Sequence, residues 1–286
     1  MTSPLAVGLA ALATVLASPR DHVSFLVMGK TTNHRQSVSG ELALLNYHFF
    51  AEIFVRDGGE VREASLAFPN GELEPFEDLG FVQEVHGGRY DEESELDRHY
   101  PNGAYRFRFT TGDGVRLDRT LRVRGTGEGR TRIPKPPKIT LLQSGRNVSP
   151  DAVDPNADLT VSFSPFESGQ ADPNGVVDDL IFVVLGDCRG EKTVHSGRPF
   201  EGKPFLTYRT TDFVFSRTEL RPGEPHQMFV EHATVDTSEQ DGIVGLVTYA
   251  STTFLDFETQ GEAKGNPCPP VMPKMDAGQT DREERR

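Results

Sequence analysis

The chain is divided by one proline-rich stretch, Ile133-Pro134-Lys135-Pro136-Pro137-Lys138. Proline lacks an amide donor and biases the preceding residue toward extended geometry, so this stretch can join neither a helix nor a central strand. It predicts a stiff linker at residues 133–138 between two units. We expect the first unit at residues 22–132 and the second at residues 139–261.

Both units carry the patterns of β-strands. Residues 105–109 alternate aromatic side chains with arginines, a glycine turn follows at 112–114, and residues 115–123 return with apolar residues in alternation. In the second unit, residues 158–166 alternate in the same way and residues 179–185 form a continuous apolar run. With 28 glycines, 20 prolines and no tryptophan, many turns and short strands are favoured. The sequence predicts an all-β chain with two β-sandwich domains in tandem.

The charge of the chain disfavours two classes of partner. Its formal net charge is −13, whereas binding to a nucleic acid requires clustered lysines and arginines that release counterions. We therefore expect no nucleic acid partner, and anionic membranes are disfavoured for the same reason.

One face of the predicted hairpin is nevertheless basic. Five arginines share it: Arg106, Arg108, Arg116, Arg122 and Arg124. We favour a solvated sheet face whose charge is balanced by the acidic residues 72–97. The alternative is a site for an acidic glycan or another anionic surface.

The N-terminus resembles an export signal. Residues 5–17 form an apolar run of the length of a signal-peptide core, too short to span a bilayer, and residues 15–17 offer small side chains for cleavage. No lysine or arginine precedes the run, so a short buried or frayed N-terminal helix is the alternative. We expect residues 1–17 to be a signal peptide, no membrane span, and a protein that is secreted, periplasmic or on the cell surface.

The two cysteines, Cys188 and Cys268, depend on that compartment. In an exported protein an isolated pair most often forms one disulfide, whereas in the cytosol the same residues would be two unrelated thiols. Residues 262–286 are rich in glycine, proline and charge, which predicts a disordered tail.

A weak calcium site is the one cofactor that the sequence suggests. Its candidate ligands are Asp172, Asn174, Asp178 and Asp179, arranged around a glycine turn. The distal glutamate of an EF-hand is missing, so a simple turn stabilised by Asp and Asn side chains is the favoured alternative.

No catalytic motif is found. Gly29-Lys30-Thr31-Thr32 echoes a phosphate loop, but the first glycine is replaced and no helical pattern follows. His226 and His232 are six residues apart in one strand-like run, for which corner and surface roles are favoured over a metal pair.

The second unit resembles a fibronectin type III or immunoglobulin-like domain. The resemblance lies in its proline-rich entry, in the strand ending at Phe163, where the family has Trp, and in Leu220-x-Pro222-Gly223-x-x-His226, where the family has the tyrosine of its corner. The order of the parts also resembles exported bacterial β-sandwich proteins. Both resemblances imply a fold and a compartment but no activity.

Three functions are therefore considered. The first is a non-catalytic exported binding or structural module that contacts a protein or glycan at the cell surface. The second is a carbohydrate-binding module, with or without assistance from calcium, in which tyrosines replace the absent tryptophan: Tyr90, Tyr100, Tyr105 and Tyr208. The third is a hydrolase with an unrecognised site, ranked last because a fold alone licenses no activity.

Overall fold

The computed structural model describes residues 18–125, 132–187 and 193–263. Within these ranges the chain is mostly β, with several sheets, one α-helix and short 3₁₀ turns. None of the helices in the described ranges is long and apolar enough to cross a membrane. The predicted signal peptide at residues 1–17, the two cysteines and nearly all of the predicted disordered tail at 262–286 lie outside the described residues.

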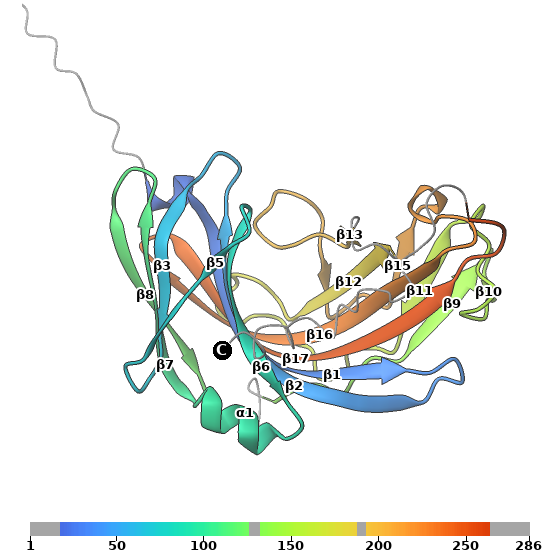
Figure 1. Ribbon diagram of the computed structural model, residues 1–286, viewed down its shortest axis with the longest axis horizontal. Coiled ribbons are helices and arrows are strands. Elements are labelled where there is room, and N and C mark those ends of the chain that lie inside the picture. Colours follow the sequence, from blue (N-terminus) through green and yellow to red (C-terminus); the bar gives the residue numbers. More distant parts are fainter. Residues whose placement is uncertain (1–17, 126–131, 188–192, 264–286) are drawn as a thin grey trace, which may run out of the picture.

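One large sheet runs through the whole molecule (Figure 1). Its nine strands lie in the order β13-β12-β16-β17-β1-β2-β6-β5, with β14 also paired to β12. The strands are β1 (Val23–Gln36), β2 (Leu42–Val55), β5 (Glu77–Asp78), β6 (Val82–Tyr90), β12 (Leu180–Asp187), β13 (Thr193–His195), β14 (Leu206–Thr207), β16 (Pro225–Gln240) and β17 (Ile243–Glu258).

Two smaller sheets pack on this large sheet. One has the order β4-β3-β7-β8 and the other the order β10-β9-β11-β15. Their strands are β3 (Val61–Ala67), β4 (Leu73–Pro75), β7 (Gly103–Thr111), β8 (Arg116–Val123), β9 (Ile139–Gln143), β10 (Arg146–Asn147), β11 (Leu159–Phe163) and β15 (Asp212–Phe215). The helix α1 (Glu93–His99) precedes β7, and the 3₁₀ turns are η1 (Pro19–Asp21) and η3 (Arg217–Glu219).

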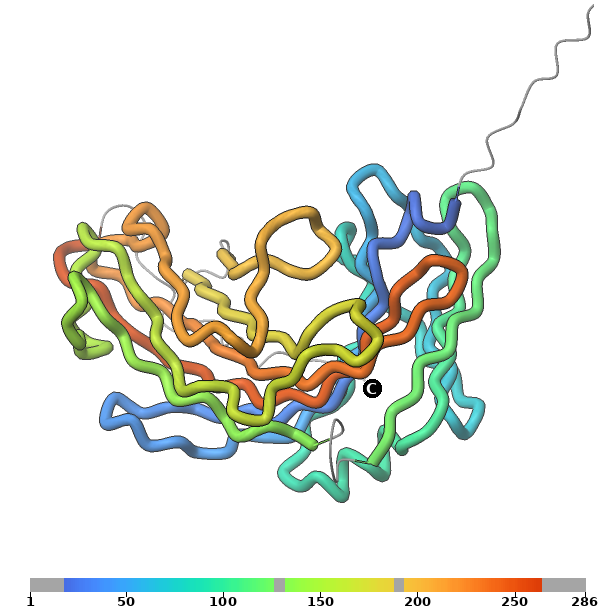
Figure 2. The backbone as a smooth tube through the Cα atoms, turned by 180° about the vertical axis from the view of Figure 1, so that it is seen from behind, coloured from blue at the N-terminus to red at the C-terminus, as the bar shows by residue number. Residues whose placement is uncertain are grey.

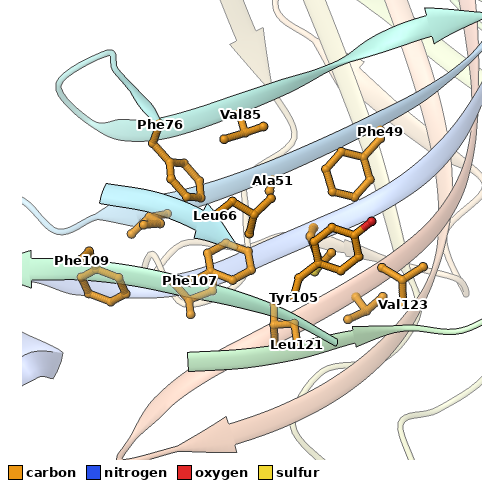
Figure 3. Close-up of a cluster of buried hydrophobic side chains, with 14 of the residues drawn as sticks. Phe49, Ala51, Leu66, Phe76, Val85, Tyr105, Phe107, Phe109, Leu121 and Val123 are labelled. Carbon is orange, nitrogen blue, oxygen red and sulfur yellow. The ribbon is translucent and has the colours of Figure 1, made fainter. Parts of the chain in front are cut away.

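The two smaller sheets cover the same face of the large one. Val247 and Tyr249 of β17 belong to the first core (Figure 3 shows part of it), and Leu255 and Phe257 of the same strand belong to the second. Alternate residues of a strand point to the same side, so all four lie on one face. This face therefore carries two hydrophobic cores, one beneath each smaller sheet.

The expected arrangement as two sandwiches in tandem is not confirmed. The first strand, β1, pairs in parallel with the last, β17, so strands from both sides of the prolines share one sheet. The contact between the end of β1 and the start of β9, called here the seam, is also held by hydrogen bonds directly after the prolines. There the side chain of Gln36 accepts a hydrogen bond from the Ile139 amide at 2.8 Å and donates one to its carbonyl at 2.7 Å.

Among the residues that the structure describes, no sheet packs on the opposite face of the large sheet. A third, smaller apolar cluster lies there, and it includes Phe25, Val27, Phe54 and Leu246. It is covered by loops instead, including one formed by residues 196–205 that connects β13 to β14. The chain path of this loop can be followed in Figure 2.

Candidate functional site

A small pocket lies on the face of the large sheet that no other sheet covers. Its volume is about 120 Å³, and residues 196–205, called here the covering loop, line it on the side away from the sheet. Most of its wall is apolar, with Phe25, Phe50, Phe54, Phe182, Phe205 and Leu246 as the main side chains. Strands β1, β2, β12, β16 and β17 all contribute to it, so the pocket is formed by residues from both halves of the chain.

The covering loop is held closely against β12. Ser196 donates its amide to the Val183 carbonyl at 2.9 Å, and its hydroxyl accepts the Val183 amide at 3.1 Å. Gly197 has φ +92°, and a Cβ there would lie 2.0 Å from the carbonyl oxygen of Pro204. Only glycine fits this position, because a side chain would be strained and would collide with the backbone. The glycine at position 197 therefore allows the two ends of the covering loop to lie close together.

Arg198 of the covering loop lies against two aromatic walls of the pocket. Its guanidinium carbon is 5.2 Å from the ring centroid of Phe54 and 5.5 Å from that of Phe182, within the range of cation–π attraction. One guanidinium nitrogen also lies 3.2 Å from Nε2 of His195 and 3.5 Å from Glu201. Burial and the charge of Arg198 lower the pKa of His195, so this imidazole is neutral at physiological pH.

Two partly buried carboxyl groups, of Glu52 and Glu231, line the same pocket. Glu84 pairs with Glu52 across β2 and β6, which places a third carboxyl group beside them. Two of the three have a partner: Glu231 accepts a hydrogen bond from the Thr252 hydroxyl at 2.7 Å, and a carboxyl oxygen of Glu84 lies 2.6 Å from Nε2 of His86. Within the described ranges, Glu52 has neither a hydrogen-bond donor nor an ion-pair partner.

The surroundings of Glu52 and Glu231 raise the pKa of both carboxyl groups. Burial, and secondly the negative charges of Glu84 and Glu231, raise the pKa of Glu52 to about 8, although Arg198 acts in the opposite direction. Burial also raises the pKa of Glu231, against the hydrogen bond from Thr252. The Glu52 carboxyl is therefore mostly protonated at neutral pH and ionises readily when a positive charge approaches.

Beside the pocket, the same face carries a neutral histidine. Burial, then the charges of Arg89 and His86, lower the pKa of His48 to about 3. It lies 6.3 Å from the rings of Phe50 and His86, measured between centroids. This part of the face therefore has uncharged imidazole next to carboxyl groups, and positive charge comes from Arg89 and Arg198.

The predicted calcium ligands lie together in the loop before β12, where their carboxylates are already used. The Asp172 carboxylate accepts four hydrogen bonds, of 2.8 to 3.2 Å, from the loop and from β16. The donors are the amides of Asn174, Val176 and Val177 and the hydroxyl of Thr237. Burial alone would raise the pKa of Asp172, but these bonds outweigh it and the pKa is lowered.

The remaining carboxylates of this loop have protein partners too. Asp178 accepts from the Asp172 amide and from Arg209, which together lower its pKa, and Asp179 accepts from the Gln170 and Val235 amides. Across the described part of the chain, no group of three or more His, Cys, Asp or Glu side chains is placed to hold a metal. Calcium binding at this loop stays a prediction.

The predicted arginine face exists on the outer side of β7 and β8. Arg106, Arg116, Arg122 and Arg124 are exposed and Arg108 is partly so. Asp118 of the same hairpin pairs with Arg106 at 2.9 Å and with Arg108 at 3.4 Å, and Arg124 lies 3.6 Å from Asp236. Asp118 therefore offsets two of the five arginines within the hairpin, and Asp236 of β16 lies beside a third.

A hollow of about 290 Å³ on this arginine face is lined by Arg108 and Arg116 but also by Glu63 and Asp118. Two positive and two negative side chains leave it close to neutral. The hollow therefore does not distinguish anions from other ligands.

Other residues considered from the sequence have structural roles. Gly29-Lys30-Thr31-Thr32 is extended within β1, and the fully buried Lys30 pairs with Asp97, so it forms no phosphate loop. His232 is buried in the second core and stacked on Phe166, so the expected surface role is wrong for it.

The tyrosines considered for sugar binding divide into two pairs. Tyr100 and Tyr105 are 8% and 0% exposed in the first core, so neither can form a sugar platform. Tyr90 and Tyr208 are partly exposed, and they stack on His99 and Arg209 respectively.

The pocket residues Glu52, Glu231 and Arg198 were missed by sequence reasoning. One signal was present: Glu52 and Glu231 each interrupt a strand of apolar and aromatic residues, at Phe-Ala-Glu-Ile and Phe-Val-Glu-His. A single carboxyl group in such a run predicts a buried or pocket-lining acid, because charged side chains are rarely buried without a role.

Comparisons with known proteins give little. No protein-family model matches the chain, and no curated protein matches it. Among solved structures, the native conformation of E. coli alpha-2-macroglobulin has 10% identity and a TM-score of 0.20 and covers 85% of this chain and 14% of that chain. Salmonella alpha-2-macroglobulin reacted with methylamine has 12% identity and a TM-score of 0.20, and the match covers 88% of this chain and 18% of that chain. The chain spans less than a fifth of either protein, and similarity this weak supports no assignment.

Proposed function

We propose that this protein is a non-catalytic binding module of the cell surface or extracellular space, and that it binds its ligand in the pocket beneath the covering loop. The observation that carries the proposal is the pocket itself. Apolar and aromatic walls enclose a few polar groups, Glu52, Glu231 and Arg198, which is the usual composition of a ligand site. The hollow on the arginine face is larger, at about 290 Å³, but charged side chains of both signs line it.

The compartment rests on the sequence. The apolar run at residues 5–17, which ends in the cleavage residues 15–17, supports export, and Cys188 and Cys268 would then form a disulfide. A partner at the cell surface, protein or glycan, follows from that compartment.

We also propose that residues 139–261 form a fibronectin type III or immunoglobulin-like sandwich. Strand order supports this: β9, β11 and β15 lie in one sheet, while β12, β16 and β17 are neighbours in the other, as strands A, B, E and C, F, G are in that fold. The corner is also consistent, since the Arg221 amide donates to Nε2 of His226 at 3.4 Å, where the family uses a tyrosine hydroxyl. Phe163 takes the expected core position.

The binding function can be tested with a matched pair of variants. Phe182 and Phe229 are both partly exposed on the same face, 6.0 Å apart, but only Phe182 lines the pocket. We expect Phe182→Ala to weaken, at least tenfold, the binding of small molecules found by NMR screening of the full chain, and Phe229→Ala to leave it unchanged. Equal effects of both variants, or binding that neither variant alters, would exclude the pocket as the site.

A second candidate, hydrolysis, is favoured by one observation. The pKa of Glu52 is raised to about 8 and a second carboxyl group stands beside it, as general acid catalysis requires. It predicts turnover of chromogenic glycosides or esters that is lost in Glu52→Gln. Absence of turnover across both substrate classes would remove this candidate.

A further inference from the structure

The pocket is short of positive charge near its carboxyl groups. Glu52, Glu84 and Glu231 come from three strands and lie close enough for their charges to act on one another. Arg198 acts on Glu52 over a distance, but it makes no ion pair with Glu52 within the described residues. A partly buried carboxyl group without a protein donor loses some of its hydration, so a ligand that supplies a donor would offset that cost.

The walls of the pocket already accommodate a cation. The guanidinium of Arg198 lies against the rings of Phe54 and Phe182, both of which line the pocket. Aromatic faces attract positive charge and do not attract carboxylates. The protein therefore shows, with its own side chain, which charge these walls favour.

The size of the pocket limits the ligand. A cavity of about 150 Å³ accepts benzene, and this pocket is somewhat smaller, at about 120 Å³. It is thus suited to a group of about the size of a benzene ring, such as a short hydrocarbon arm that ends in one polar group. Since the wall is mainly apolar, the arm would contact phenylalanines while the polar end meets Glu52.

We infer that the pocket binds an organic cation, an alkylammonium or alkylguanidinium group on a short hydrocarbon arm, with Glu52 as its counter-ion. This inference rests on the proposed function and names its ligand class. The ammonium or guanidinium donates to the Glu52 carboxylate, Glu84 and Glu231 add negative potential, and the arm packs against the rings of Phe54 and Phe182. The net charge of −13 raises the local concentration of such ligands.

The test uses the full chain and four probes that share an n-butyl arm: n-butylammonium, n-butylguanidinium, n-butanol and pentanoate. Calorimetry should show binding of the two cations, weaker binding of butanol and none of pentanoate. We expect Glu52→Gln to weaken cation binding at least tenfold, while Glu258→Gln, an exposed glutamate of the same sheet, changes it less than twofold. Butanol binding as tight as n-butylammonium, or cation binding equal in Glu52→Gln and the native chain, would overturn the inference.

A second variant separates loss of the counter-ion from loss of the fold. Arg198→Met removes the internal cation and keeps an apolar arm of similar length, so cation affinity should rise several-fold, a gain that misfolding cannot produce. Unchanged or weaker cation binding in this variant would contradict the inference.

Two further binding measurements complete the test. A short peptide with a single arginine distinguishes a protein partner from a free amine: it binds more tightly than n-butylguanidinium only if the natural cation is a side chain. If Phe182→Ala weakens butanol binding but the protein does not prefer cations, the proposed binding function is retained and only the proposed ligand class is refuted. If no probe binds and Phe182→Ala has no effect, the proposed function fails as well.

Discussion

The raised pKa of Glu52 has a measurable consequence for stability. In the unfolded chain a glutamate ionises near 4.5, whereas in the folded protein Glu52 ionises only near about 8. Between these values the unfolded state releases a proton that the folded state keeps, so raising the pH favours unfolding. The contribution of Glu52 is thus fully present below pH 4.5 and is lost as the pH rises toward about 8.

The size of the effect follows from the pKa difference. Each unit of pKa difference corresponds to about 1.4 kcal/mol, so a rise from 4.5 to about 8 gives roughly 3.5 kcal/mol between about pH 5 and about pH 8. Water reaches part of this side chain, so we expect about 2 kcal/mol. Glutamine keeps the shape of the side chain but does not titrate, so Glu52→Gln should remove this loss.

The assay is urea unfolding of the native chain, Glu52→Gln and Glu258→Gln across that pH range. The native chain and Glu258→Gln should lose about 2 kcal/mol more than Glu52→Gln as the pH rises. Histidines and other acids titrate in all three proteins, so their contributions largely cancel in the comparison. Parallel curves for all three would refute the reasoning about the pocket.

Three other predictions concern the fold. Gln36→Ala removes both side-chain bonds to Ile139 and should lower the free energy of unfolding by roughly 2–4 kcal/mol; a loss below about 0.5 kcal/mol would show that the seam does not depend on them. Gly197→Ala should cost about 1–3 kcal/mol and expose the covering loop to proteolysis, because its Cβ meets the Pro204 carbonyl; unchanged cleavage would contradict the closed loop. Asp172→Ala removes four accepted hydrogen bonds and should lower the melting temperature at neutral pH, with or without a calcium chelator. A native melting temperature that rises on adding calcium, and no longer does so in Asp172→Ala, would instead establish the calcium site.

Alternation predicted many of the strands but not their partners. The hairpin of β7 and β8 and the strand β11 follow from residues that alternate in the sequence, and their register depends on neighbouring segments. The parallel pairing of β1 with β17 joins residues from opposite ends of the chain, and nothing in either strand specifies that partner. The proline stretch was therefore interpreted as a boundary between sheets, although one sheet continues past it.

The pocket was unpredictable for a related reason. Glu52 and Glu231 lie on separate long strands, and Arg198 lies in a loop whose path depends on Gly197 and on contacts with β12. Local pattern shows that each glutamate interrupts an apolar strand, but only the assembled sheet brings them to one cavity. The calcium loop shows the opposite case, since its Asp and Asn residues act on neighbouring amides, as its local sequence suggested.

The union of the first strand with the last also bears on how the molecule is made. β1 leaves the ribosome early, but β17, its neighbour along eleven paired residues, is synthesised only after almost every other element. Contacts between such distant segments slow folding, since a long loop must close before they form. During synthesis β1, paired with β2 in the first hairpin, therefore has one edge without its partner strand. The large sheet is completed only once translation has passed Glu258.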